Sequence, residues 1–575
     1  MINFQSYPNV TKVTIPKDIQ LSTQNFYNIF SGMVNLKEIN IKQPITDISF
    51  MCNNCFNLTT INVITDHIVN MNNAYYNCRH LIGSPHSGPE VIDMANAYGY
   101  CLKLTGSPVI GDNVVNAAWT YSMCQNLTGS PVIGKSQTNM LGTYRYCINL
   151  TGEPIMSNKI KNMSYAYDHC TGLTGSPVCG ENVTHMAVAY RGCSELTGDP
   201  AIGPNVGSMA GAYMECSGLT GPVVMHDFAW AIDGAYYNCK AVTGSPICPS
   251  NAKTMAGTYA NCYCITGAPQ CHENITNMAW TYDHCQNLTG NPVCSNVVTN
   301  MQYTYRDCWN LTGSPVVSDL VTDMIGTYWG CNKITGSPVF SNAVTQVAYA
   351  YAGCSNLTGE AFIPPNISNI AGLYYDCSNL TGTFTCPDNI IYFNGTFSGC
   401  TNMSGNPVCG PNVVNFAATY NSCTNLTGSP VCGDKVTSME STYMNCVNLT
   451  GSPIIGPLVK NMIYTYRNCV NLTGSPICTN IVNDMTGTYY GCTGLTGTPV
   501  CGNNVTTMSY TYVNCIGLTG SPVIGNKVTN CYNTYQYCIG LTGSPICGNS
   551  VNIFEGTYVG CTGLTGAPVC GNNVQ

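Results

Sequence analysis

The sequence predicts a repeat solenoid, in which one chain winds through many short turns stacked on one another. Cysteine recurs every 23 residues from Cys55 to Cys561 with no insertion or deletion. From Cys78 onward an aromatic residue stands three places before each of these cysteines, and leucine usually stands three places after it. A fixed period of about 20 to 50 residues is typical of solenoids, because each unit is too small to bury its own apolar face and must stack on its neighbours.

The residues of one repeat have distinct structural roles. We number slots from the leucine of a reference unit, so that Leu127 is slot 1, Met140 is slot 14, Tyr144 is slot 18 and Cys147 is slot 21. Like residues in successive turns form ladders, and we expect Leu, Val, Met, Tyr and Cys ladders to fill the interior. Glycine and proline at fixed slots turn the corners. Recurring Asn and Thr are expected to bond neighbouring turns.

The repeats define two regions. Residues 1–33 form a degenerate amino-terminal turn, and its polar residues suggest a cap. Residues 34–575 form one solenoid of 22 full repeats and a partial carboxyl-terminal turn. Leu564, Val569 and Cys570 would lie on a turn with no successor, and an uncovered parallel edge invites pairing. We therefore expect a second copy or a partner protein to cover that end.

The phrase N-V-T-x-M-x-x-T-Y-x-x-C-x-x-L-T resembles the BspA-like leucine-rich repeats, which share the spacing of Tyr144, Cys147 and Leu150. The resemblance implies short parallel β-strands stacked into an elongated rod, with its curvature left open. It also implies surface adhesion. The chain departs from the family at slots 4 and 5, which read Ser-Pro where an aliphatic strand is usual. Because proline lacks a ladder donor, we expect strands of only two or three residues.

Composition excludes several classes of protein. Charged residues make up 8% of the chain, against roughly 25% in an average domain. The net charge is −8 with no basic stripe, which argues against nucleic-acid binding. There is no run of about 18 apolar residues, so membrane insertion is not expected. The opening residues MINFQSYPNVTK do not resemble a signal peptide.

The 37 cysteines are most simply interpreted as buried thiols. Of these, 23 occupy slot 21 and 11 occupy slot 7, where isoleucine is a common substitute. Interchange with isoleucine is typical of a small buried hydrophobe. Two alternatives remain open: a disulfide ladder between turns, and zinc at Cys52 and Cys55 or at Cys262, Cys264, Cys271 and His272. We expect no metal and no cofactor.

No arrangement of catalytic residues stands out, so the sequence predicts a protein that is not an enzyme. The eight histidines are scattered over different slots. The pairs Asp168-His169 and Asp283-His284 recur five turns apart, too far to meet, and we interpret them as exposed polar variation. A catalytic site needs such groups to converge in one pocket.

The variable slots 16 and 19 are the candidate binding surface. Both flank slot 18 on an expected outward side, and exposed Trp, Tyr and Arg are enriched at recognition surfaces. An alternative is that the slot-16 aromatics only cover a glycine of the neighbouring turn. The candidate residues are Trp119, Arg145, Tyr165, Arg191, Trp280, Tyr303, Arg306, Trp329, Tyr349, Tyr464, Arg467 and Tyr510.

Together these features predict a non-enzymatic structural and adhesion protein on a virus particle, as a phage tail or head appendage. Its ligand would be a host-surface molecule such as a carbohydrate, or another virion protein. Two alternatives share the same sequence features: a secreted bacterial cell-surface adhesin and an intracellular scaffold that binds proteins. The predicted location is accordingly the virion, or the extracellular or cell surface.

Overall fold

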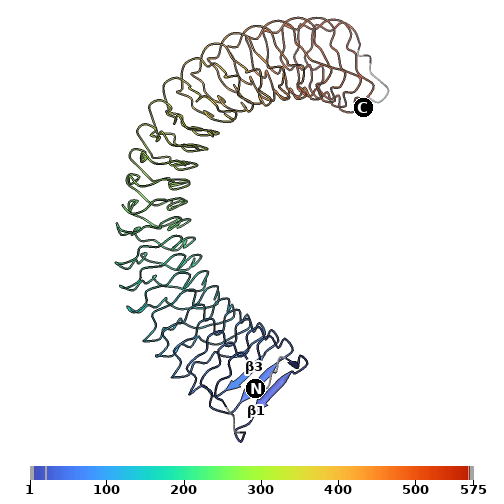
Figure 1. Ribbon diagram of the computed structural model, residues 1–575. Helices are drawn as coiled ribbons and strands as arrows, with labels where there is room; N and C mark the ends of the chain where they lie inside the picture. Colours follow the sequence, from blue (N-terminus) through green and yellow to red (C-terminus); the bar gives the residue numbers. More distant parts are fainter. Residues whose placement is uncertain (1–5, 20–22, 568, 570–575) are drawn as a thin grey trace. The chain divides into compact units, whose positions relative to one another are not determined.

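The computed structural model describes residues 6–19, 23–567 and 569. The chain divides into two compact units, Met1–Thr289 and Gly290–Gln575. In each unit, successive 23-residue turns stack in the order of the sequence (Figure 1). The predicted repeat solenoid is confirmed, since the Leu, Met, Tyr and Cys ladders are buried as expected.

The first unit begins with a three-stranded parallel sheet in the order β1-β2-β3. The strands are β1 (Lys12–Ile15), β2 (Glu38–Ile41) and β3 (Thr60–Val63). Val13 pairs with Ile39, and Ile39 pairs with Ile61. Alternate β-branched residues point to one face, and on β2 the side chains of Ile39 and Ile41 are 0% and 1% exposed. None of these three strands contains proline.

After β3, proline at slot 5 of most turns ends regular strand pairing. In the rest of the described chain, parallel pairing consists of single-residue bridges, most of them at slot 13, such as Asn116 to Asn139 and Asn139 to Asn162. The pairing is therefore shorter than the two or three residues that the sequence predicts. The reason is that proline offers no N–H to a neighbouring turn.

Backbone hydrogen bonds from alternate residues hold the turns together. The N–H groups of slots 14, 16, 18 and 20 donate to carbonyls of the following turn. Met140 donates to Asn162 at 2.9 Å, and Tyr144 donates to Ala166 at 2.9 Å. The N–H groups between them donate within their own turn, as Thr143 does to Met140 at 3.2 Å. This alternation gives buried backbone donors a partner without an extended strand.

The slot-18 tyrosines form a stack of rings whose hydroxyls bind the backbone. Neighbouring ring centroids lie between 5.2 and 6.0 Å apart. The Tyr144 hydroxyl donates to the Val132 carbonyl at 2.6 Å and accepts from the Val132 N–H at 3.0 Å. The same pair of bonds, to the residue 12 places earlier, recurs along both units. Each hydroxyl thus satisfies the slot-6 groups that a strand partner would otherwise bind.

The slot-21 cysteines also bond between turns. The Cys147 thiol donates to the Tyr121 carbonyl at 3.1 Å, and the Cys331 thiol donates to the Tyr305 carbonyl at 2.9 Å. These thiols are fully buried. Cysteine at this slot therefore combines a small apolar side chain with a donor that satisfies a buried carbonyl.

Polar side chains add the predicted Asn and Thr ladders. Thr143 donates through its hydroxyl to the Ala117 carbonyl of the previous turn at 2.8 Å. The Asn149 amide donates to the Gln125 carbonyl at 2.8 Å. The repeat-to-repeat bonding of these residues is confirmed.

The two ends of the chain are described in part. In the region 1–33, Phe26, Phe30 and Met33 are buried, and β1 pairs with β2; a capping role for this turn stays a prediction. At the other end, Val569 is 63% exposed and Leu564 is half-buried, whereas Cys570 lies outside the described residues. Association through that end also stays a prediction.

The tyrosine ladder can be tested at Tyr305, whose hydroxyl donates to the Val293 carbonyl at 2.6 Å and accepts from its N–H at 3.0 Å. Tyr305→Phe should cost about 1 to 3 kcal/mol, because it leaves two partly buried backbone groups of Val293 without a partner. Tyr305→Ala should cost about 3 to 5 kcal/mol through lost packing. Hydrogen exchange should show the loss at the Val293 amide. Protection of that amide equal to wild type would contradict the assigned bond.

The thiol ladders predict alkaline instability. Burial raises the pKa of the Cys179, Cys294 and Cys432 thiols to about 11, whereas unfolded thiols ionise near pH 8.5, an approximate reference value. Between these values the unfolded chain binds fewer protons than the folded chain, so the free energy of unfolding should fall as pH rises from about 8.5 to 11. Guanidinium unfolding under reducing conditions at increasing pH measures this slope.

Cys147→Ala should reduce that pH slope, and Cys264→Ser, at an exposed thiol, serves as the matched control. An unfolding midpoint that is equal at neutral pH and at about pH 10 would show that buried thiols do not control the alkaline limit.

Candidate binding face

The candidate residues of slots 16 and 19 are mostly half-buried. We call them the aromatic–arginine face. Trp280, Trp329 and Tyr510 are the most exposed of them, at 36%, 36% and 37%. The remaining members are Trp119, Arg145, Tyr165, Arg191, Tyr303, Arg306, Tyr349, Tyr464 and Arg467, all of intermediate exposure.

The slot-16 backbone is left-handed in every repeat from Phe50 to Gly556. Glycine, which adopts this conformation freely, occupies the slot at Gly142, Gly326 and several other turns. Eight aromatics adopt it as well, with φ from 51° to 60°: Phe50, Trp119, Tyr165, Trp280, Tyr303, Tyr349, Tyr464 and Tyr510. For a residue other than glycine this conformation costs roughly 1 to 2 kcal/mol. The aromatics therefore occupy the slot against local preference.

Several of these rings cover a glycine of the next turn. A Cβ atom added at Gly142 would lie 2.1 Å from the Trp119 ring, and one at Gly326 would lie 2.4 Å from the Tyr303 ring. The same arrangement joins Tyr349 to Gly372 and Tyr464 to Gly487. The packing interpretation of slot 16 is confirmed at these turns. Because the rings are only half-buried, this packing uses only part of their surface.

In the first unit, three of the candidate residues meet. The Trp119 and Tyr165 rings lie 5.8 Å apart, two turns from each other in sequence. The Arg145 guanidinium, from the turn between them, lies 5.9 Å from each ring centroid and 4.9 Å from that of Tyr146. The result is a half-exposed cluster of planar groups around one positive charge.

Asp168 connects Arg145 to Arg191, a contact that the sequence analysis missed. Arg145 Nε lies 3.0 Å from one oxygen of Asp168, and Arg191 Nε lies 2.8 Å from the other. His169 Nδ1 also lies 2.6 Å from the carboxylate. The hydrogen bond to Asp168 raises the pKa of the Arg191 guanidinium. The ring cluster around Arg145 is thus joined through one buried carboxylate to a second arginine, Arg191.

The prediction that Asp168-His169 and Asp283-His284 are exposed polar variation is wrong for the aspartates. Asp168 is 0% exposed and Asp283 is 2% exposed. The physical reason is that Asp168 lies between the slot-19 arginines of the turns before and after it, and each carboxylate also contacts the histidine that follows it. The signal was present in the sequence as Arg, Asp and Arg at slot 19 of three consecutive turns.

The second unit contains smaller groups of the same kind. The Arg306 guanidinium lies 4.6 Å from the Tyr303 ring. Arg467 lies 5.2 Å from the Tyr464 ring and 4.7 Å from that of Tyr490. Two further ring contacts involve candidate residues: Trp329 stacks on Tyr349 at 5.1 Å, and Tyr510 meets Tyr532 edge to face at 5.3 Å.

The described residues contain no group of three His, Cys, Asp or Glu side chains placed to hold a metal ion. The thiols proposed as alternative zinc ligands bond within the ladders: Cys55 donates to the Phe30 carbonyl at 3.0 Å, and Cys262 donates to the Tyr236 carbonyl at 3.1 Å. In the same part of the chain no helix is long and apolar enough to cross a membrane.

Comparison with known proteins agrees with the resemblance found in the sequence. Residues 2–83 and 324–450 match the family described as BspA type leucine rich repeat region, in six copies. A search of curated proteins gives no match.

Solved structures of leucine-rich repeat proteins are similar to the chain at low identity. A leucine-rich repeat protein from Bacteroides ovatus has 13% identity and a TM-score of 0.27, over 69% of this chain and 87% of that one. YopM from Yersinia enterocolitica has 11% identity and a TM-score of 0.31, over 82% and 88%. A leucine rich cell surface protein from Faecalibacterium prausnitzii has 13% identity and a TM-score of 0.25, over 69% and 86%.

The bridged arginine pair can be tested by Asp168→Asn. The substitution leaves two guanidinium groups without their carboxylate, and we expect a local cost of about 3 kcal/mol, the lower end for breaking a buried pair. Hydrogen exchange in the turns around Asp168 measures this cost. Asp112→Asn is the matched control, because its pair with Lys135 is exposed and exposed ion pairs contribute little to stability. Equal effects of the two substitutions would contradict the assignment.

Proposed function

We propose that this chain, which carries leucine-rich repeats of the BspA type, is a non-enzymatic adhesion protein that binds its ligand through the aromatic–arginine face. Leucine-rich repeat proteins of this family are surface or protein-binding repeat proteins. The proposal adds to this general role a particular surface and a class of ligand.

One observation carries the proposal: large aromatics occupy a slot whose backbone favours glycine. Slot 16 is left-handed in every one of these turns, and glycine fills it in many of them. Strained positions persist where the surrounding structure enforces them, and they cluster at binding sites. Packing on the slot-16 glycine of the next turn explains how the rings are held in place. It does not explain why the rings are present, because glycine at slot 16 of both turns would avoid the strain and need no such packing. A binding role supplies the reason for keeping the rings.

The chemistry of the face favours a carbohydrate with acidic groups. Half-buried Trp and Tyr rings offer flat apolar surfaces at low entropic cost, as at other recognition surfaces. Arg467 lies against two tyrosine rings, which orients its planar guanidinium for paired hydrogen bonds to a carboxylate or sulfate. Such a ligand belongs to the surface of a cell, in agreement with an adhesion role.

We propose that the protein is located on a phage particle, as a tail or head appendage. The alternative is a secreted bacterial adhesin. The gene neighbourhood separates the two: adjacent capsid or tail genes would support the first, and detection of the chain on intact bacterial cells would support the second.

The binding face can be tested with glycine substitutions. Trp119→Gly and Tyr464→Gly replace strained aromatics with the residue that neighbouring turns use at the same slot. Relief of about 1 kcal/mol of strain should offset part of the lost packing, so thermal stability should change little. Binding to a glycan array and to host cells should fall by about 30-fold or more, the effect of losing a 2 kcal/mol hot spot.

Trp230→Thr is the matched control for this experiment. Trp230 is 54% exposed, stands at slot 12 outside the aromatic–arginine face, and has threonine at the same slot in other repeats such as Thr138. This substitution should leave binding unchanged. If the glycine variants bind as tightly as wild type, or if only Trp230→Thr loses binding, the face is assigned wrongly.

A further inference from the structure

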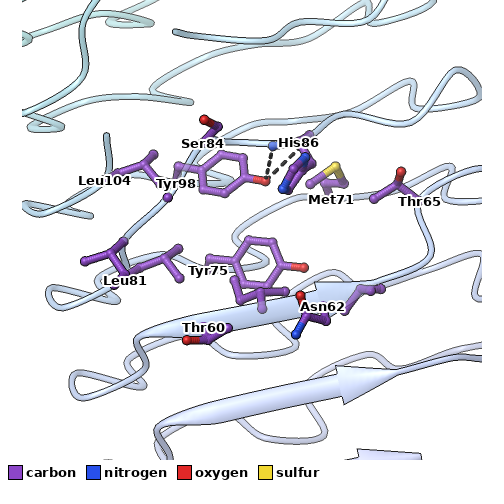
Figure 2. Close-up of a pocket in the computed structure, with 14 residues that line it drawn as sticks. Thr60, Asn62, Thr65, Met71, Tyr75, Leu81, Ser84, His86, Tyr98 and Leu104 are labelled. Carbon is purple, nitrogen blue, oxygen red and sulfur yellow. Dashed lines mark hydrogen bonds between the residues drawn. The ribbon is translucent and has the colours of Figure 1, made fainter. Parts of the chain in front are cut away.

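A cavity of about 340 Å³ opens beside β3 in the first unit. Figure 2 shows its lining, with β3 on one side and the following turn on the other. Met71 and Leu104 contribute apolar walls, and Ser84 and His86 come from the next turn. The volume falls in the range of roughly 300 to 1,000 Å³ that is typical of ligand sites.

The cavity exists because the sheet stops at β3 while the stack continues. No backbone hydrogen bond joins Thr60–Val63 to the next turn among the described residues. Pro85 at slot 5 of that turn has no N–H to offer. A Cβ added at Gly83 would meet no atom within 4 Å, whereas one at Gly106, the same slot one turn later, would lie 2.3 Å from the Ser84 hydroxyl. The space beside β3 is therefore particular to this turn.

The apolar side chains of β3 are incompletely covered. Ile39 and Ile41 of β2 are 0% and 1% exposed, but their partners Ile61 and Val63 on β3 are half-buried and line the cavity. An edge strand with open backbone groups and open aliphatic side chains is a template for a further strand.

The missing hydrogen-bond partner of Tyr75 indicates which chemical group fits the cavity. It is 3% exposed and lines the cavity, yet its hydroxyl makes no hydrogen bond to any described residue. In the next turn the Tyr98 hydroxyl binds both the N–H and the carbonyl of His86 (Figure 2). The residue 12 places before Tyr75, which the hydroxyl would bind in the other turns, is Val63. Val63 instead pairs with Ile41 in the sheet.

Burial raises the pKa of Tyr75, so its hydroxyl keeps its proton and can both donate and accept. Along the stack this hydroxyl consistently takes the N–H and carbonyl of a single peptide residue. The Tyr75 hydroxyl therefore lacks the backbone N–H and carbonyl that the other ladder tyrosines bind, and an extended peptide segment could supply both.

We propose that the cavity beside β3 binds an extended peptide segment of a partner protein, which continues the parallel sheet as a fourth strand and places one residue's N–H and carbonyl on the Tyr75 hydroxyl. Strand addition of this kind takes its affinity from main-chain bonds and its specificity from alternate side chains. The segment should carry β-branched residues at alternate positions, as β1, β2 and β3 do. This site is separate from the aromatic–arginine face and does not depend on it.

The test uses the full-length chain and a fluorescent peptide with the β3 sequence Thr-Ile-Asn-Val, flanked by lysines for solubility. Saturable binding by fluorescence anisotropy is expected. Tyr75→Phe should weaken binding about 2- to 12-fold, the range for loss of one hydrogen-bonding group. Phenylalanine is accepted in this ladder at Phe397, so the variant should fold.

Two controls separate the site from general effects. Tyr121→Phe removes a hydroxyl that already binds Val109, and it should leave peptide binding unchanged. In a parallel sheet, successive N–H groups point to opposite sides of the strand. A peptide methylated at the nitrogens that face β3 should lose binding, whereas one methylated at the nitrogens that face away should lose only the bond to Tyr75 and weaken by about 2- to 12-fold, as Tyr75→Phe does.

Absence of saturable binding to the wild-type chain would overturn the proposal. So would equal binding by wild type and Tyr75→Phe, or equal binding of the two methylated peptides, since either result would mean that the peptide does not continue the sheet.

Discussion

The fold depends on one interaction, the pair of hydrogen bonds between a slot-18 tyrosine hydroxyl and the slot-6 backbone of the same turn. Proline at slot 5 prevents an extended strand there, and the partly buried N–H and carbonyl of slot 6 would then be left without partners, which is costly. The hydroxyl satisfies both groups. In the turn from Gln125 to Cys147, Tyr144 binds Val132 in this way. Each turn therefore closes on itself before it stacks on its neighbours.

Closure within each turn leaves the rest of the backbone free to bond between turns. Slots 14 to 20 do so with alternate N–H groups, and the left-handed residues at slots 16 and 20 make that alternation possible. The same geometry places slots 16 and 19 beside the tyrosine ladder with half of their surface open. The scaffold thus fixes the position of these side chains and leaves their identity free, which is the arrangement a binding surface needs.

Much of this architecture follows from the sequence, because a strict period shows which residues form ladders. The buried Tyr, Cys, Met and Leu columns and the Asn and Thr bonds between turns were predictable. The partner of the tyrosine hydroxyl was not, since a contact 12 residues away within one turn has no periodic signal of its own. The bridge from Arg145 through Asp168 to Arg191 was missed for a different reason. Its signal lies in three consecutive turns at one slot, whereas the two Asp-His pairs that stand out in the sequence are five turns apart.

The twelve candidate residues were chosen by type and slot, and the structure brings some of them together, as with Trp119, Arg145 and Tyr165. Sequence could not show that the slot-16 backbone is left-handed, because glycine and tryptophan at one slot suggest tolerance rather than strain. The cavity beside β3 was equally hidden. It results from the change from strand to proline-containing turn between Val63 and His86. The sequence does not show where the regular strands end, so it does not show the gap beside the last one.

The locality of the bonds has a consequence for how such a gene can change. Each turn bonds to itself and to the turns directly before and after it, so its stability is set by nearest neighbours. A recombination event that removes or duplicates a whole 23-residue unit leaves every remaining turn with neighbours of the same kind. The number of turns can therefore vary among descendants of this gene without any compensating substitution, while a deletion that is not a whole number of repeats would leave one turn incomplete and break its bonds to both neighbours.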